Sequence, residues 1–188
     1  VRHQVLHKSK LLGYNIPLFF LSKMNQDIQI IDNFLDDNEY QILYDLMLAK
    51  TPRTENFKWS FCEQTALDGD GYCQFVHLFW WNYQRESDYQ PDVLYDKLDY
   101  FELVRCKANL QLKDIKKITP PFHVDVDEDC KTAIFYMNSN NGYTLFENGD
   151  TIESVKNRVV IFPSQYMHTG VNTTDSKYRM VINVNYFD

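Results

Sequence analysis

The sequence predicts a mostly β domain, a sandwich or barrel with helices ahead of its strands, and three observations lead to this. Short runs rich in Val, Ile, Phe and Tyr recur through the second half of the chain. Asn-Gly pairs, which are typical of tight turns, lie between some of these runs. Two amphipathic segments precede the runs, and helices placed there can cover one sheet from outside.

The first expected elements are a strand and a helix. The β-branched run Ile28–Ile31 predicts the strand. The acidic stretch Asp36–Glu39 then suits the first turn of a helix, because negative charge is favourable at a helix N-terminus. The helix should continue to Thr51-Pro52, with its apolar residues at helical spacing: Tyr40, Leu43, Leu46 and Met47.

A hairpin and a second helix come next. Two aromatic-rich runs between Phe57 and Tyr83 flank the turn cluster Asp68-Gly69-Asp70-Gly71, which predicts the hairpin. The run Phe75–Tyr83 could stack bases or line a substrate groove, but its alternation favours packing within a sheet. Pro91 at a first helical position opens the second helix, with apolar residues at helical spacing at Val93, Leu94, Leu98 and Phe101.

The remaining elements are short strands separated by turns at Asn141-Gly142 and Asn148-Gly149. Strands at short, regular spacing are typical of sandwiches and barrels. The expected strands are Leu103–Leu112, Lys131–Met137, Tyr143–Phe146, Val159–Phe162 and Met180–Phe187.

Composition narrows the class of protein. With 188 residues, 44% of them hydrophobic, the chain suits one domain. Its 26 acids against 19 bases give a net charge of −7, which argues against duplex binding without excluding a nucleic-acid partner. The four cysteines form no Cys-x-x-Cys pair, so we expect free thiols in a reducing cytoplasm. The longest apolar stretch, Leu11–Leu21, is interrupted by Asn15 and Pro17 and is too short to cross a membrane.

The N-terminal segment differs from the rest. Residues 1–23 carry four bases and no acid, and Met24 is a natural start. We therefore expect residues 1–23 to be an extension, derived from upstream sequence or from expression, and residues 24–188 to form a single domain.

One cluster of residue types points to a metal. His123 and Asp125 flank Val124, and in an extended segment residues two apart point to the same side, so both can bind one ion. His168 follows the predicted strand Val159–Phe162. In a sandwich, the chain that leaves this strand would return to the same open end of the fold as His123 and Asp125. Two histidines and one carboxylate leave three adjacent positions open on an octahedral metal, as non-haem Fe(II) requires. Taken alone, the tripeptide could equally be a turn pair beside the solvated acidic loop Asp125–Asp129.

Arg179 is a candidate anion ligand. It lies eleven residues after His168, at the start of the last predicted strand. Its planar guanidinium could bind a carboxylate inside the barrel, although a surface ion pair is the common role of an arginine. A dicarboxylate that chelates the metal at one end could reach Arg179 with the other.

From about Leu103 to Asp188 the chain resembles the Fe(II)- and 2-oxoglutarate-dependent oxygenases, and within them the prolyl-hydroxylase-like branch. Five ordered blocks carry the resemblance: His123-Val124-Asp125, Thr132–Asn138, Gly142-Tyr143-Thr144, Asn157–Ser164 ahead of His168, and Arg179 ahead of Asn185–Asp188. The resemblance implies a double-stranded β-helix, or jelly roll, supported by N-terminal helices.

The resemblance also implies roles for individual residues. His123, Asp125 and His168 would bind Fe(II), and Arg179 would bind the far carboxylate of 2-oxoglutarate. Tyr136 would help to hold that carboxylate through its hydroxyl, although a core tyrosine is the ordinary alternative. The branch usually places another tyrosine on the strand before His-x-Asp, where this chain has Asn109 and Gln111.

The function implied is that of a monomeric, cytoplasmic dioxygenase that uses Fe(II), 2-oxoglutarate and O₂ to hydroxylate an unactivated carbon. A prolyl residue in a peptide or protein is the preferred substrate class. Two alternatives stay open: a nucleic-acid-demethylating or hydroxylating enzyme of the same family, and a metal-binding jelly roll without turnover.

Overall fold

The computed structural model describes residues 27–65 and 70–188. The predicted extension 1–23 and the first half of the predicted turn at 68–71 lie outside these ranges. Neither helix within the described ranges is long and apolar enough to cross a bilayer.

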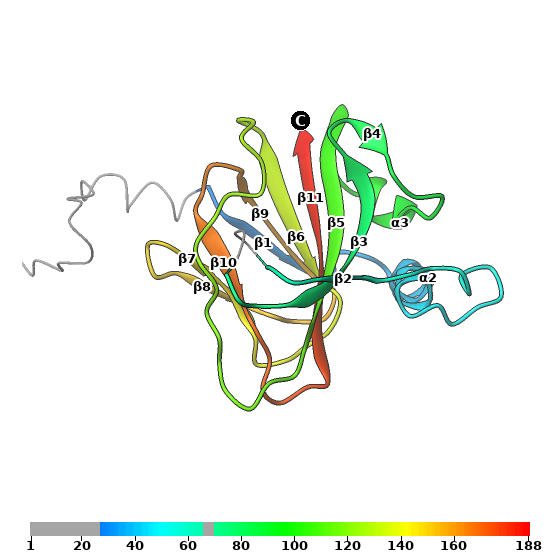
Figure 1. Ribbon diagram of the computed structural model, residues 1–188. Coiled ribbons are helices and arrows are strands. Elements are labelled where there is room, and N and C mark those ends of the chain that lie inside the picture. Colours follow the sequence, from blue (N-terminus) through cyan, green and yellow to red (C-terminus); the bar gives the residue numbers. More distant parts are fainter. Residues whose placement is uncertain (1–26, 66–69) are drawn as a thin grey trace, which may run out of the picture.

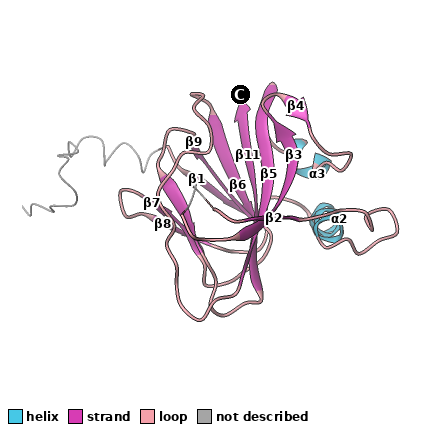
Figure 2. Cartoon of the chain, viewed as in Figure 1, coloured by secondary structure: helices cyan, strands magenta, loops and turns pink. Residues whose placement is uncertain are grey.

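The described residues form mainly strands (Figures 1 and 2). This confirms the predicted mostly β class. In chain order the elements are β1 (Gln29–Asp32), α2 (Asp37–Met47), β2 (Ser60–Cys62), β3 (Gln74–Trp81), β4 (Gln84–Arg85), α3 (Asp92–Tyr95), β5 (Glu102–Leu112), β6 (Lys131–Tyr136), β7 (Tyr143–Phe146), β8 (Thr151–Glu153), β9 (Arg158–Pro163), β10 (His168–Val171) and β11 (Tyr178–Phe187).

Two antiparallel sheets make the jelly roll. The large sheet has the order β1-β9-β6-β11-β5-β3-β2, with β4 paired to β3, and the small sheet has the order β10-β7-β8. Figure 1 shows the large sheet fanned across the middle of the molecule, with the small sheet on one side of it and both helices on the other. The predicted double-stranded β-helix with N-terminal supporting helices is confirmed.

Each face of the large sheet packs in its own core, because successive strand residues point to opposite faces. On β11, for example, Met180 and Ile182 lie in the core shared with the helices, whereas Val181 lies in the core between the sheets. The helix-side core also contains Leu43 and Met47 of α2. The inter-sheet core is smaller and comprises Ile134, Tyr136, Phe146, Ile152, Val160, Phe162 and Val181.

The helix α2 begins where its sequence predicts. The Asp36 side chain accepts a hydrogen bond from the backbone N–H of Glu39 (2.8 Å), and the Glu39 side chain accepts one from the backbone N–H of Asp36 (2.9 Å). This reciprocal pair satisfies two N–H groups that the helix leaves without internal partners.

The second predicted helix is shorter than its apolar spacing suggests. The helix α3 ends at Tyr95, Pro91 is its N-cap rather than its first helical residue, and the next turn is closed by a bond from the Leu98 N–H to the Tyr95 carbonyl. Phe101 is 72% exposed, and its N–H donates to the carbonyl of Phe187 at the end of β11. The end of the segment that the periodicity assigned to a helix is therefore hydrogen-bonded to the end of β11 instead.

Three strands were not predicted. The strands β4 and β8 have two and three residues, too few to show alternation. The strand β10 reads His-Thr-Gly-Val, so it offers little of the apolar pattern that marks a strand.

The hairpin prediction is confirmed, since β2 pairs with β3 in antiparallel register. The aromatic run on β3 serves sheet packing in part: Phe79 is fully buried, and Phe57 stacks on His77 with ring centroids 4.0 Å apart. All four cysteines are unpaired.

Asn157 joins two segments that are far apart in the sequence. It adopts a left-handed φ of 61°, and its buried side chain accepts a bond from the Leu35 N–H (2.9 Å) and donates one to the Leu35 carbonyl (2.7 Å). Asn tolerates this conformation better than most residues. Its side chain thereby fixes the segment between β1 and α2 to the start of β9.

We expect Asn157→Ala to lower the free energy of unfolding by about 2–4 kcal/mol, because it leaves two buried backbone groups unpaired and puts a Cβ residue in the left-handed region. Urea denaturation followed by circular dichroism measures this. Lys177→Ala, at an exposed position, is the control and should stay within about 0.5 kcal/mol of the parent. An equally small change for Asn157→Ala would contradict the role given to this side chain.

Candidate metal centre

A backbone bridge brings the two candidate histidines together. The His123 N–H donates to the His168 carbonyl and the His168 N–H donates to the His123 carbonyl, both at 3.0 Å. This pairing attaches the loop after β5 to the start of β10. Asp125 lies beside both rings, with Oδ1 3.9 Å from His123 Nε2 and Oδ2 3.8 Å from His168 Nε2. The three potential ligand atoms all lie within 4.8 Å of one another.

Both imidazoles are oriented by backbone carbonyls. His123 Nδ1 lies 3.3 Å from the Pro121 carbonyl oxygen, and His168 Nδ1 lies 3.0 Å from that of Tyr166. A carbonyl oxygen only accepts, so each Nδ1 must carry the proton. In a neutral ring the lone pair is then on Nε2, the atom that faces Asp125. Burial lowers the pKa of His123, which favours this neutral form.

Asp125 is held in its ionised form. Arg105 Nη1 lies 3.1 Å from Oδ1, and the Asn183 side-chain amide donates to Oδ2 at 3.0 Å. Burial opposes ionisation of this carboxyl group, but the positive charge of Arg105 outweighs it and holds the pKa of Asp125 well below its usual range. Each carboxylate oxygen has two lone pairs and so keeps acceptor capacity for a metal.

The donor set fits a divalent metal ion. His168 Nε2 is buried and has no hydrogen-bond partner among the described residues, and an unpartnered buried nitrogen is costly unless something binds it. Two neutral imidazoles and one carboxylate, each oriented by a further hydrogen bond, are what such an ion needs from a protein. His123, Asp125 and His168 could therefore hold an ion with several coordination positions left open.

Arg179 points into the same interior. Its side chain is buried, with Nε donating to Ser154 Oγ (3.1 Å) and Nη2 donating to Thr144 Oγ1 (3.2 Å). Within residues 27–65 and 70–188, no carboxylate forms a salt bridge with it. A buried guanidinium whose hydrogen-bond partners are hydroxyls can serve as a receptor for an anion.

Two glycines leave room for this guanidinium. A Cβ at Gly142 would lie 2.7 Å from Arg179 Cδ and 2.8 Å from the Val171 carbonyl oxygen, and a Cβ at Gly170 would lie 3.1 Å from Arg179 Nη1. Larger residues at these positions would displace the arginine.

Tyr136 lies beside Arg179, with the guanidinium carbon 5.7 Å from the centre of its ring. Its fully buried hydroxyl donates to Thr144 Oγ1 at 2.7 Å. Burial raises the pKa of Tyr136, so the phenol stays protonated. Thr144 Oγ1 thus accepts from both Tyr136 and Arg179, and its own proton is left to donate into the pocket.

The three candidate metal ligands, Arg179 and Thr144 line one pocket between the sheets, called the central pocket below, whereas Tyr136 contacts Thr144 from outside the pocket wall. The wall of this pocket includes six polar side chains that the sequence analysis gave no role at a site: Thr65, Gln74, Lys107, Thr144, Thr169 and Asn183. The signal was present on β5, where polar and apolar residues alternate from Arg105 to Gln111, but such alternation normally marks a solvent-facing side. The central pocket is lined by Thr65, Gln74, Lys107, Asn109, Gln111, Pro120, His123, Asp125, Ile134, Thr144, His168, Thr169, Gly170, Arg179, Val181 and Asn183.

Asn109 and Gln111, on the strand where the resemblance leads us to expect a tyrosine, both line this pocket. Gln111 is paired with Arg179 across β5 and β11, and its buried Oε1 has no hydrogen-bond partner among the described residues.

The aromatic run Phe75–Tyr83 contributes nothing to the pocket wall, so the structure does not bring it to the site.

We expect the chain to bind one equivalent of a divalent ion such as Co(II), and His168→Ala to abolish that binding. Asn183→Ala should weaken it by about 10- to 100-fold, because it removes the amide that orients Asp125. Calorimetric titration of the ion measures both effects. Asn148→Ala, in the turn between β7 and β8, is the matched control, and equal affinities for the two asparagine variants would contradict the assignment.

The fold is shared with solved oxygenase structures. A prolyl hydroxylase from Trichoplax adhaerens, in complex with a hypoxia inducible factor oxygen degradation domain peptide fragment, aligns with a TM-score of 0.61 and 17% identity over 89% of this chain and 87% of that chain. A 2OG-Fe(II) oxygenase family oxidoreductase from Burkholderia pseudomallei aligns with a TM-score of 0.62 and 13% identity over 89% of each chain. The viral collagen prolyl hydroxylase of Paramecium Bursaria Chlorella virus-1 gives 0.55 and 14% over 85% of this chain and 94% of that chain.

No protein-family model and no curated protein matches the sequence. The likeness therefore lies in the backbone and in its topology rather than in overall sequence identity. The chain has the fold of the 2-oxoglutarate and Fe(II) oxygenases, prolyl hydroxylases among them.

Proposed function

We propose that this protein is an Fe(II)- and 2-oxoglutarate-dependent dioxygenase that hydroxylates an unactivated carbon. The observation that carries the proposal is the meeting, in one pocket, of three metal-ligating side chains and a buried arginine that lacks a carboxylate partner. The first set suits a divalent ion and the second suits a dicarboxylate bound to that ion. The shared fold agrees with this chemistry.

When bound, Fe(II) and 2-oxoglutarate supply O₂-dependent hydroxylation of a C–H bond, coupled to release of CO₂ and succinate. His123, Asp125 and His168 would hold the metal from one side and leave the other side open. Their orientation is set by the carbonyls of Pro121 and Tyr166 and by Asn183. These contacts preorganise the ligands, so little reorganisation accompanies metal binding.

At the other end of the pocket, Arg179 would pair with the far carboxylate of 2-oxoglutarate. Thr144 would donate its free hydroxyl proton to the same group, and Tyr136 fixes Thr144 in position. The buried surroundings strengthen this ion pair because little water screens it.

The substrate class we favour is a prolyl residue in a peptide or protein. Two of the three solved structures named above are described as prolyl hydroxylases, one of them in complex with a peptide fragment. The net charge of −7 argues against a nucleic-acid substrate, whose phosphates favour basic proteins.

Purified protein with Fe(II), 2-oxoglutarate and O₂ should form succinate, and proline-containing peptides should stimulate this and gain 16 mass units. We expect His123→Ala and His168→Ala each to lower succinate formation at least about 1,000-fold, because the ion is no longer held. Mass spectrometry of peptide and succinate checks both products. Metal binding without any succinate would instead support the non-catalytic jelly roll, and stimulation by oligonucleotides alone would support the nucleic-acid alternative.

Arg179→Ala should raise the 2-oxoglutarate concentration needed for half-maximal succinate formation by about 10- to 100-fold, while metal affinity stays unchanged. The variant loses a charge-assisted bond worth about 1.5–3 kcal/mol. Thr144→Val, nearly the same size, should produce a smaller shift in the same direction. A parallel loss of metal affinity in either variant would mean that the pocket, rather than the carboxylate contact, had been damaged.

A further inference from the structure

The central pocket contains a second cation that the proposed chemistry does not use. Lys107 of β5 lines the pocket beside the candidate metal ligands. Among the described residues it has no hydrogen-bond or salt-bridge partner. Burial, reinforced by the charge of Arg105, lowers the pKa of Lys107 to about 8, although Asp125 opposes the shift. A half-buried ammonium that lines a pocket and has no partner is available to an anionic ligand.

The strand register separates Lys107 from the co-substrate end of the pocket. Lys107 is paired with Asn183, and Gln111 is paired with Arg179, across the same two strands. Four residues therefore separate the two cations along the sheet, about 13 Å at roughly 3.3 Å per residue. Asn183 donates to Asp125, so Lys107 lies level with the candidate metal ligands, whereas Arg179 lies further along the strands. A dicarboxylate that extends from the ion to Arg179 therefore points away from Lys107.

The charges around the pocket leave Lys107 uncompensated. Asp125 is the one carboxylate among the described lining residues, and it is already paired with Arg105. Asp127 and Glu128 line a separate groove, together with Trp81, Arg105 and Asp125 itself. A bound divalent ion and the dianion of 2-oxoglutarate carry equal and opposite charges, so they do not neutralise the lysine.

We infer that the substrate carries a carboxylate close to the carbon that is oxidised, and that Lys107 binds this carboxylate. The inference rests on the proposed function and specifies its substrate. The carboxylate can come from a free amino or imino acid or from an acidic side chain next to the modified residue of a peptide. The small number of apolar side chains in the pocket wall, which are Pro120, Ile134 and Val181, agrees with a polar substrate.

The test uses the full chain loaded with Mn(II) and 2-oxoglutarate, without O₂, and titrates acid and amide pairs by calorimetry. The first arm compares each free L-amino acid, proline included, with its amide. The second compares blocked peptides in which Asp or Asn precedes Pro. We expect the acid of at least one pair to bind about 10-fold or more tightly than its amide, and the arm in which this occurs identifies the source of the carboxylate.

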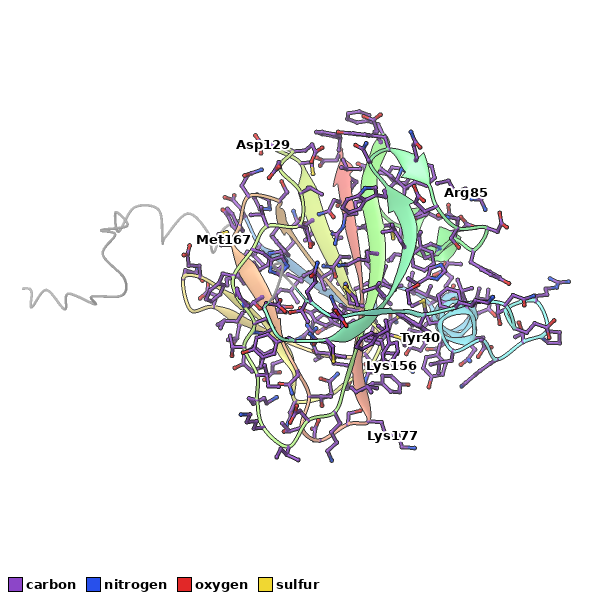
Figure 3. All side chains as sticks on the ribbon, viewed as in Figure 1. Tyr40, Arg85, Asp129, Lys156, Met167 and Lys177 are labelled. Atoms are coloured by element: carbon purple, nitrogen blue, oxygen red, sulfur yellow. The ribbon has the colours of Figure 1, made fainter. Side chains whose placement is uncertain are left out.

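Lys107→Met keeps the length of the side chain and removes its charge, so it should abolish the preference for the acid, and Lys107→Arg should retain it. Lys177→Met is the matched control at an exposed position near the start of β11 (Figure 3). In the absence of ligands, Lys107→Met should unfold at an equal or higher urea concentration, because it removes a half-buried charge that has no salt-bridge partner among the described residues.

Several results would overturn the inference. These are no acid preference in any pair, an acid preference that survives in Lys107→Met, or a loss of stability in that variant that marks a structural role. An equal loss of 2-oxoglutarate affinity would assign Lys107 to the co-substrate instead. Failure of the parent protein to bind Mn(II) and 2-oxoglutarate would overturn the proposed function itself, and this titration is made first.

Discussion

The reciprocal backbone pair between His123 and His168 is the contact on which the site depends. These residues are 45 positions apart, and each belongs to a segment that the other holds in place. The pairing adds one bridge to the edge of the small sheet. It thereby fixes the distance between the two imidazole rings and the distance of each ring from Asp125. A site built in this way is as rigid as the sheet that carries it, which suits a centre whose ligands must be correctly oriented before an ion arrives.

The sheet in turn depends on two unlike cores. Between the large sheet and the helices the packing is apolar and extensive, with α2 and α3 covering β5, β6 and β11. Between the two sheets the apolar cluster occupies only part of the space, and the remainder is the central pocket. The helix-side core stabilises the sheet, so the inner face can carry polar and charged groups that an ordinary sandwich core would not tolerate.

Much of this arrangement follows from local pattern. Strands such as β7 and β9 lie within one residue of their predicted bounds, because several β-forming residues in a row leave little choice. The strand β10 was missed because its residues serve the site rather than the core. The contacts of Arg105 and Asn183 with Asp125 were also missed, since they join residues 20 and 58 positions from it and no local pattern records such distances. Motif spacing indicated the candidate ligands, whereas the groups that orient them emerge only when the strands are placed in register.

The two faces of β5 have a consequence for how this fold diversifies. Cys106 and Ala108 pack against the helix side, while Lys107 and Asn109 face the pocket, so neighbouring residues perform separate tasks. Exchange of an inward residue alters recognition and leaves the apolar packing of the strand intact. Lineages can thus acquire new chemistry one alternate position at a time without passing through unfolded intermediates. This offers a physical account of how chains with only 13–17% identity retain one architecture.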